Sequence, residues 1–391
     1  MQNFVFYNPT KVYFGTEQLS NLGPELKRFG QKVLLIYGGN SIKASGLYDR
    51  IICELNNSDL TVHELPGVEP NPRHTTVNKG AAICKENGID VVLAVGGGSV
   101  IDCAKTVAVA ALYDGDDCWD LISRKAVVND NLPIVSVLTL SATGSEMDIG
   151  AVINNTELKK KWTIFGPALR CSVSFLDPTA TYSVGAYQTA CGCVDILSHI
   201  MDNAYFSAKD EMDMLLRIQE EVMKTVVKFA PIAIENPKDY DARANLMWAS
   251  SWALNGFLYD GLRQDAIAHR IEHELSAYYD ITHGHGLAII IPRWLKYILN
   301  EQTAPRIKRF GENILNIDSS LPLLEGAEMA IKKLEDFFYI TLGLASRLSQ
   351  LGISEENFSK MAENACGRIH SMSGFTVLEP EDVEKIYRMC L

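Results

Sequence analysis

The chain changes character near residue 185. Before that point, short runs of β-branched and aliphatic residues alternate with stretches of helical pattern. The strand-like runs cover residues 32–37, 61–65, 90–95, 133–139 and 173–176. Such alternation is typical of βαβ units on a mostly parallel sheet. Later residues show long segments with a 3.6-residue period, such as 211–229 and 240–258. The sequence therefore predicts an α/β domain over 1–184 and an all-α domain over 185–391.

The charge balance restricts the possible partners. Lys and Arg number 36 against 48 for Asp and Glu, giving a formal charge of -12. An acidic surface disfavours sequence-independent binding to nucleic acid or anionic lipid. The chain has no run of 18 apolar residues, and its start lacks the basic and apolar regions of a secretory signal. We expect a cytoplasmic protein with a small-molecule partner and with neither nucleic acid nor membrane as a partner.

Two glycine-rich turns follow predicted strands. One is Gly38-Gly39 after the first strand, and the other is residues 96–98 after the third. Ligands of open α/β sheets bind at the carboxyl ends of the strands, and glycines let the backbone approach a diphosphate at a helix start. A plain tight turn is the alternative, because Ser99 and Asp102 also resemble an ordinary capping box.

Histidines gather in the second half of the chain. Four of the eight, His269, His273, His283 and His285, lie within 17 residues. Clustered histidines indicate a metal site. His269 and His273 are four residues apart in a helical pattern and project from one face. Spacing alone does not decide which of those two is a ligand.

A second candidate pair lies upstream of this cluster. Asp195 and His199 are four residues apart in GCVDILSHI, an otherwise apolar helical segment. A buried carboxylate is costly unless a cation or hydrogen bonds compensate it. A metal ion bound by both side chains is one explanation, and an Asp bonded to a neighbouring helix end is the other.

Taken in order, the motifs resemble one family, the iron-dependent (group III) alcohol dehydrogenases, and within it the butanol dehydrogenase and broad aldehyde reductase branch. The resemblance covers essentially the whole chain and rests on FVFYNPTKVYFG, YGGNSIKASG, GVEPNPR, VGGGSVIDCAK, LTLSATGSE, FLDP, D-x3-H and H-x3-H-x9-H-G. It implies a dehydroquinate-synthase-like architecture, with an α/β nucleotide-binding domain and an all-α metal-binding domain. Relatives of this kind are commonly homodimers.

The resemblance also implies roles for individual residues. The family's metal-ligand pattern falls on Asp195, His199, His269 and His283, and the position of His273 lies beside nicotinamide and substrate. The residues implied at the cofactor are Gly38, Gly39, Asn40, Ser41, Asn71, Gly96, Gly97, Gly98, Ser99, Asp102, Thr139, Thr143, Ser145, Asp148 and Lys161. Relatives in this branch usually carry Asn where Asp148 stands. His285 is expected to line the pocket without being a ligand.

The implied reaction is hydride transfer between NAD(P)H and short- or medium-chain aldehydes or primary alcohols. One carboxylate and three imidazoles suit Fe2+, the metal of the family, and also Zn2+, Co2+ or Mn2+. The cation would act as a Lewis acid. His273 is the candidate for proton delivery; alternatively it shapes the pocket while water and the cofactor ribose carry the proton.

The first strand bears on the choice of nucleotide. NAD-preferring members of the family commonly place an Asp where Gly39 stands. Without that carboxylate a 2'-phosphate meets no repulsion, and Ser41 and Lys43 offer hydrogen bonds to it. We therefore expect NADP(H) to be favoured and NAD(H) to be possible.

Three other functions fit parts of the sequence. One is an NAD- and metal-dependent sugar-phosphate cyclase or lyase of the same fold, and another is an NADH-preferring alcohol or polyol dehydrogenase. The third is a non-catalytic metal or nucleotide-binding protein. A cyclase needs several Lys and Arg for its phosphorylated substrate, whereas the segment MWASSWALNGFLYDG is apolar and aromatic. The sequence therefore favours an uncharged substrate.

Overall fold

The computed structural model describes residues 2–206, 212–262, 266–367 and 371–391, and these form two units. One unit is Tyr7–Val184, and the other contains Gly185–Leu391 together with residues 2–6. Residues 2–6 thus belong to the helical unit, whereas the sequence assigned them to a domain over 1–184. They join the helical unit because the Gln2 N–H donates to the Gly261 carbonyl at 2.8 Å and the Phe6 ring packs edge-on against Phe257.

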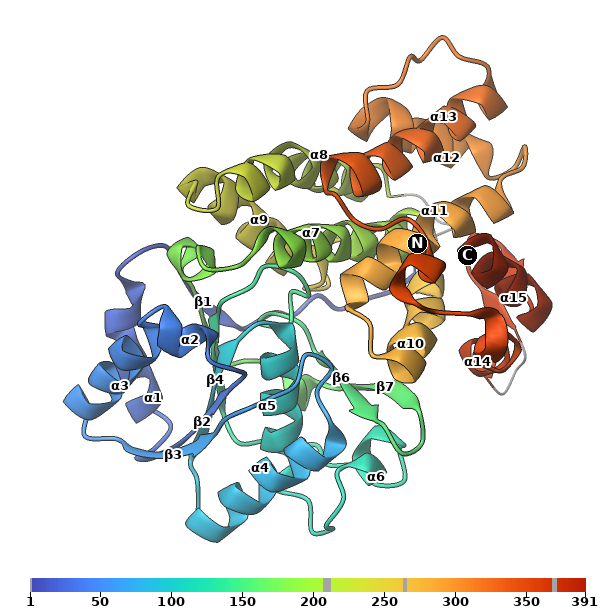
Figure 1. The fold of residues 1–391 in the computed structure, drawn as a ribbon. Helices are drawn as coiled ribbons and strands as arrows, with labels where there is room; N and C mark the ends of the chain where they lie inside the picture. The colour runs from blue at the N-terminus through green and yellow to red at the C-terminus, as the bar shows by residue number, and fades with distance from the viewer. Residues whose placement is uncertain (1, 207–211, 263–265, 368–370) are drawn as a thin grey trace. The chain divides into compact units, whose positions relative to one another are not determined.

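A six-stranded parallel sheet forms the centre of the first unit (Figure 1). Its strands are β1 (Lys11–Phe14), β2 (Lys32–Tyr37), β3 (Thr61–Leu65), β4 (Val91–Gly96), β5 (Ile134–Leu138) and β8 (Val173–Leu176). Their order in the sheet is β1-β8-β5-β4-β2-β3. The predicted α/β class and its parallel sheet are confirmed. The five predicted strands are present, and β1 is an edge strand that the sequence analysis did not identify.

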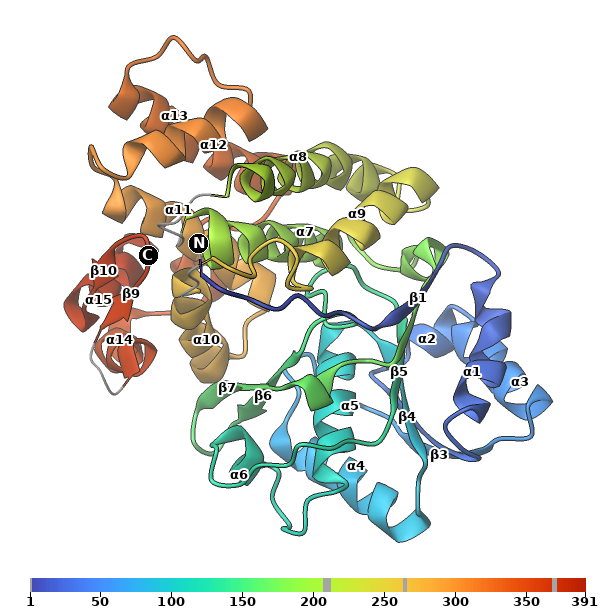
Figure 2. The same cartoon turned by 180° about the vertical axis from the view of Figure 1, so that it is seen from behind.

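Helices cover both faces of this sheet. α1 (Leu22–Lys27) and α3 (Leu47–Asn57) pack on one face, where their leucine and isoleucine side chains meet the valines and leucines of β2 and β4. α4 (His74–Asn87) and α5 (Gly98–Ala110) lie on the opposite face (Figures 1 and 2). All residues of β4 and β5 are buried as a result. Burial on both faces explains why these strands are composed almost entirely of apolar residues.

The unit also contains short helices and a second sheet. Among them are α2 (Ser41–Ala44), α6 (Trp119–Ile122) and an antiparallel pair, β6 (Gly150–Asn155) and β7 (Lys160–Phe165).

The order in which consecutive strands are placed in the sheet reverses between β2 and β4. β3 pairs with one side of β2, and β4 pairs with the other side, where Tyr37 lies opposite Val95. Ligands of such sheets bind outside the carboxyl ends of the strands at this switch point. Both glycine-rich turns therefore lie where a nucleotide is expected.

The second unit is built from helices. They are α7 (Ala186–Ile200), α8 (Asp213–Glu235), α9 (Tyr240–Ala253), α10 (Ile267–Tyr279), α11 (His283–Ile298), α12 (Ala304–Ile314), α13 (Leu323–Asp336), α14 (Phe358–Cys366) and α15 (Pro380–Met389). α7 contacts α8, α9 and α11, and every residue from Thr189 to Ile200 is buried. Among the described residues, no helix is long and apolar enough to cross a membrane. The burial of α7 and its contacts with three helices explain its apolar sequence.

Three details differ from the expected helical domain. A short antiparallel pair, β9 (Met372–Ser373) and β10 (Val377–Leu378), follows α14, so the unit is not entirely α-helical. α9 ends at Ala253 and not at residue 258, because Gly256 takes a positive φ of 98° and the chain turns. α8 extends to Glu235, beyond the predicted 211–229, and residue 211 lies outside the described residues.

Candidate functional site

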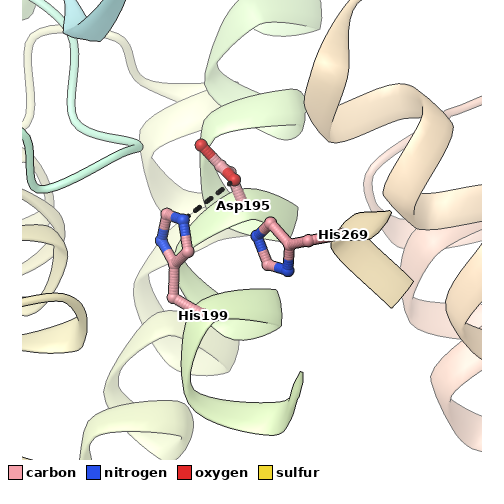
Figure 3. A group of neighbouring side chains, drawn as sticks. All are labelled: Asp195, His199 and His269. Carbon is pink, nitrogen blue, oxygen red and sulfur yellow. Dashed lines mark ion pairs between the residues drawn. The ribbon is translucent and has the colours of Figure 1, made fainter. Parts of the chain in front are cut away.

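Asp195 and His199 lie on one face of α7, as their four-residue spacing predicts (Figure 3). Both side chains are buried, and Asp195 Oδ1 lies 3.7 Å from His199 Nε2. Burial, followed by the charge of the neighbouring His269, lowers the pKa of His199 well below its usual value. Burial thus favours the neutral imidazole, which is the form that has a lone pair for a cation.

His269 joins this pair from the first turn of α10. Its ring stacks on His199 with centroids 5.0 Å apart and planes inclined by 14°. One potential ligand atom from each of Asp195, His199 and His269 lies within 4.8 Å of the others. Residues far apart in the sequence thus form a compact set of metal-ligating groups.

His283, the first residue of α11, faces the same carboxylate. Its Nε2 lies 3.7 Å from Asp195 Oδ1, and its ring centroid lies 5.4 Å from that of His269. Two atoms that bind one ion at ~2.1 Å with a tetrahedral angle are ~3.4 Å apart. The distances from Asp195 to His199 and to His283 are close to this value and too long for hydrogen bonds. Asp195, His199 and His269 thus form one group of potential metal ligands, and His283, which groups with Glu272 and His273, lies at a compatible distance from Asp195.

His273 lies one turn beyond His269 and belongs to a neighbouring group. Its potential ligand atom lies close to those of Glu272 and His283, and its ring centroid is 6.4 Å from that of His269. Glu272 Oε2 and His283 Nδ1 are in direct hydrogen-bond contact. His269 thus groups with Asp195 and His199, whereas His273 groups with Glu272 and His283.

Both ring nitrogens of His285 have other partners. Nδ1 contacts the Tyr187 hydroxyl at 3.1 Å, and Nε2 contacts the Ala345 carbonyl at 3.0 Å. Because a carbonyl only accepts, Nε2 carries the proton and Nδ1 accepts from Tyr187. Both ring nitrogens of His285 are thus engaged by groups other than the candidate ligands.

Two buried carboxylates that the sequence analysis did not single out contact candidate ligands. Asp202 Oδ2 lies 2.9 Å from His269 Nδ1, and Glu272 contacts His283 Nδ1. Burial lowers the pKa of His269, but the hydrogen bond to Asp202 and the charges of nearby carboxylates outweigh it, so that the pKa is raised. Asp202 could have been found as the third member of an i, i+4, i+7 stripe with Asp195 and His199. Glu272 gave no such signal because its partner comes from the next helix.

In the α/β unit, two of the predicted cofactor loops lie against each other. A Cβ added at Gly98 would be 2.2 Å from Thr143 Oγ1, and one added at Gly97 would be 3.1 Å from Leu140 Cβ. Thr139 donates its N–H to the carbonyl of Gly96 at 3.0 Å. The glycines are therefore needed for the close approach of the loops that follow β4 and β5.

The segment that contains Asn71 meets the same loops. The Ser99 hydroxyl donates to the Pro70 carbonyl, and Asn71 itself is buried. Lys161 on β7 is paired in register with Asn154, whose N–H donates to the Pro72 carbonyl at 2.8 Å. Three loops and the β6–β7 pair thus bring most of the predicted cofactor residues to one edge of the sheet.

Asp102 and Asp148 are buried carboxylates that join α5 to the residues around β6. Asp102 accepts hydrogen bonds from the Ser145 hydroxyl at 2.6 Å and from the Val152 N–H at 2.8 Å. Burial raises the pKa of Asp102 to about 6 against the opposing charge of Lys105. Asp148 pairs with the ammonium of Lys105, which is fully buried. Both carboxylates therefore position the segments that carry the other predicted cofactor residues.

The residues after β2 are exposed. A Cβ added at Gly39 would meet no atom within 4 Å, and Asn40 and Ser41 lie at the surface. Lys43 Nζ lies 5.3 Å from the Tyr37 ring centroid and 4.8 Å from that of Tyr48. Gly39 therefore has open space beside it, and the Lys43 ammonium lies near the Glu64 carboxylate, which accepts from the Tyr37 and Tyr48 hydroxyls.

Comparisons with known proteins show the family of the chain. The family model described as "Iron-containing alcohol dehydrogenase" matches residues 9–178, and the one described as "Fe-containing alcohol dehydrogenase family, C-terminal" matches residues 189–391. The chain is 48% identical to NADH-dependent butanol dehydrogenase B of Clostridium acetobutylicum over 93% of both chains. It is 33% identical to the NADPH-dependent aldehyde reductase YqhD of Escherichia coli over 90% of both. The crystal structure of NADH-dependent butanol dehydrogenase A from Thermotoga maritima is similar with a TM-score of 0.94 and 38% identity, covering 100% of this chain and 99% of that one.

Proposed function

Because the chain belongs to the iron-containing alcohol dehydrogenase family, we propose that its helical unit binds a catalytic divalent cation through Asp195, His199, His269 and His283. The chain is an alcohol and aldehyde oxidoreductase that depends on NAD(P)H. The observation that carries the metal proposal is the position of Asp195 Oδ1, 3.7 Å from the Nε2 atoms of both His199 and His283.

The proposed substrates are short- and medium-chain aldehydes and the corresponding primary alcohols. Two relatives from Clostridium acetobutylicum are named butanol dehydrogenases, and the Escherichia coli relative is named an aldehyde reductase. An apolar pocket discriminates single methylenes by only ~1 to 3 kcal/mol, so a broad range of chain lengths is expected. The sugar-phosphate cyclase alternative is not favoured by these relatives.

The four ligands define which chemistry is available. When bound, the cation supplies Lewis acidity that polarises a carbonyl oxygen. Asp195 provides a negative charge and the imidazoles provide neutral donors, a set that suits Fe2+, the metal in the family's description, and also Zn2+, Co2+ or Mn2+. His273 is proposed to deliver the proton to the product oxygen, since it is only partly buried and its ring lies 5.4 Å from that of His283. If His273 only shapes the pocket, water and the ribose hydroxyls carry the proton.

The α/β unit is proposed to bind the nicotinamide nucleotide at the switch point between β2 and β4. The glycine-rich loop after β4 and the start of α5 suit a diphosphate, because the N–H groups of the first helical turn favour negative charge. The relatives' names divide between NADH and NADPH. We propose a preference for NADPH, because Gly39 brings no carboxylate to the adenosine end and Lys43 lies nearby. NADH remains usable in this proposal.

The proposed function is tested by metal analysis of the purified protein and a panel of two- to eight-carbon aldehydes with NADPH and with NADH. Stoichiometric metal and reduction of the aldehydes are expected, with NADPH used more efficiently. Removal of the metal with a chelator should abolish turnover, and adding back Fe2+ or Zn2+ should restore it. Metal binding without any change in NAD(P)H absorbance would instead support the non-catalytic binding protein. We also propose a homodimer, as the resemblance implies, and light scattering should give twice the chain mass of 43.3 kDa; the mass of a single chain would contradict it.

A further inference from the structure

We propose that Asp202 is the positioning residue of the metal centre. Its carboxylate fixes both the backbone and the imidazole of His269, so that the ring presents Nε2 to the cation. This inference rests on the ligand set proposed above, and it assigns a function to a residue that is not itself a ligand.

One oxygen of Asp202 makes both contacts. Oδ2 accepts from the His269 backbone N–H at 2.8 Å and lies 2.9 Å from His269 Nδ1. Asp202 is completely buried, and a buried carboxylate is costly unless hydrogen bonds compensate it. Two contacts to a single residue fix the position of its Cα and the orientation of its ring together.

The contact with the backbone also replaces a missing helix cap. α10 begins after Ala266, which has no side chain able to accept a hydrogen bond from the first turn. His269 is the third residue of α10, and the N–H group at this position is one of those that a capping oxygen normally satisfies. Asp202 therefore caps α10 from a different segment of the chain, and a change at Asp202 acts on helix and ligand at once.

The position of Asp202 follows from the helix that carries two other ligands. Asp202 is seven residues beyond Asp195 and three beyond His199, which keeps all three on nearly the same helical face. α7 passes directly into a π-helical turn, Met201–Tyr205, that contains Asp202. π-helical turns are frequent at functional sites. One continuous segment thus supplies two ligands and the carboxylate that orients a third.

The hydrogen bond determines which nitrogen of His269 is available. A carboxylate accepts, so Nδ1 must carry the proton that is shared with Asp202, and the lone pair lies on Nε2. Nε2 is the nitrogen on the side of Ser198, 3.5 Å from its hydroxyl, on the same helix as Asp195. A carboxylate on the second nitrogen fixes the orientation of a metal-binding imidazole and raises its basicity.

His283 shows the same arrangement. Its Nδ1 contacts Glu272, whose other oxygen accepts from the Ser276 hydroxyl at 2.6 Å, while its Nε2 faces Asp195. In contrast, His199 Nδ1 has no hydrogen-bond partner among the described residues. Two of the three imidazoles are thus held through Nδ1 by buried carboxylates, which supports orientation as the function of Asp202.

The test compares Co2+ binding by the full-length wild-type protein and by two variants, D202N and D202E. Asn still accepts a hydrogen bond from the helix terminus but has no negative charge, whereas Glu keeps the charge. The matched control is D239N, because Asp239 caps α9 through the Ala242 N–H at 2.8 Å and is a pure helix cap. Affinity is measured by competition with a chelator, and the visible absorption of Co2+ reports its coordination.

We expect D202N to bind Co2+ ~10- to 100-fold more weakly than wild type, with an altered absorption band. D202E should have intermediate affinity, and D239N should match wild type in affinity and spectrum even if its Tm falls. A D202N protein with wild-type Co2+ affinity and spectrum would overturn the inference. A fall in Tm alone would do the same, because it would show a purely structural role. Should D202N fail to fold, the same criteria apply to D202E. A wild-type protein that binds no Co2+ would overturn the ligand assignment itself, which distinguishes the two failures.

Discussion

Asp195 Oδ1 and His283 Nε2 lie 3.7 Å apart, although one belongs to α7 and the other begins α11. This distance suits two ligands of one cation better than a hydrogen bond. We expect H283A to lose most of its bound metal and its turnover, and D195A, H199A and H269A to do the same. Elemental analysis and aldehyde reduction assays check this. Variants with full metal content and near-normal rates would show that the ligands lie elsewhere.

His273 should behave differently from the four ligands. H273A is expected to keep its metal yet reduce aldehydes more slowly, by ~100-fold or more if His273 transfers the proton. The measurement is kcat over a range of pH, alongside metal content. Metal loss as large as in H269A would mean that the two histidines have exchanged roles. An unchanged pH profile would reject proton transfer by His273 while leaving the metal site intact.

The nucleotide preference is expected to depend on Gly39. G39D should lower kcat/KM for NADPH at least ~10-fold and leave that for NADH nearly unchanged, because repulsion acts only on the 2'-phosphate. The substitution fits, since an added Cβ meets no atom within 4 Å. G39N is the matched control of similar size without charge and should retain the preference. Equal losses with both nucleotides in G39D, or a wild-type preference for NADH, would contradict the proposal.

The buried ion pair between Lys105 and Asp148 should matter for stability. In D148A the Lys105 ammonium stays buried, 2.9 Å from the Gly150 carbonyl, but lacks its carboxylate partner. We expect the free energy of unfolding to fall by ~3 to 5 kcal/mol. D148N should lower the free energy of unfolding by less, because the Asn amide oxygen still accepts a hydrogen bond from Lys105. Adding K105M to D148A should recover much of the loss, as urea unfolding would measure. No recovery in the double variant would show that Asp148 acts through other contacts.

Much of the fold could be predicted because most of the strands are buried on both faces. β2, β4, β5 and β8 are therefore mostly apolar, and the buried Ser136 and Ser174 hydroxyls pair with each other. β1 was missed because this edge strand, KVYF, is short and partly exposed. The β6–β7 pair was missed because its turn region, NNTELKKK, is polar and resembles a loop.

The site was predictable only in part. The Asp195 and His199 pair followed from helical spacing, since both belong to one helix. His269 and His273 share a helical face, and only the position of α7 beside α10 distinguishes them. The contacts of Asp202 with His269 and of Glu272 with His283 join residues from different segments, so no local pattern encodes the second pair.

The central claim is that Asp195 and three histidines bind one divalent cation, and X-ray absorption spectroscopy of the zinc-loaded protein tests it most directly. We predict one Zn2+ per chain, with nitrogen and oxygen neighbours at ~2.0 to 2.2 Å and the outer-shell scattering of three imidazoles. A sulfur neighbour at ~2.3 Å, fewer than two imidazoles, or no stoichiometric zinc would contradict the account.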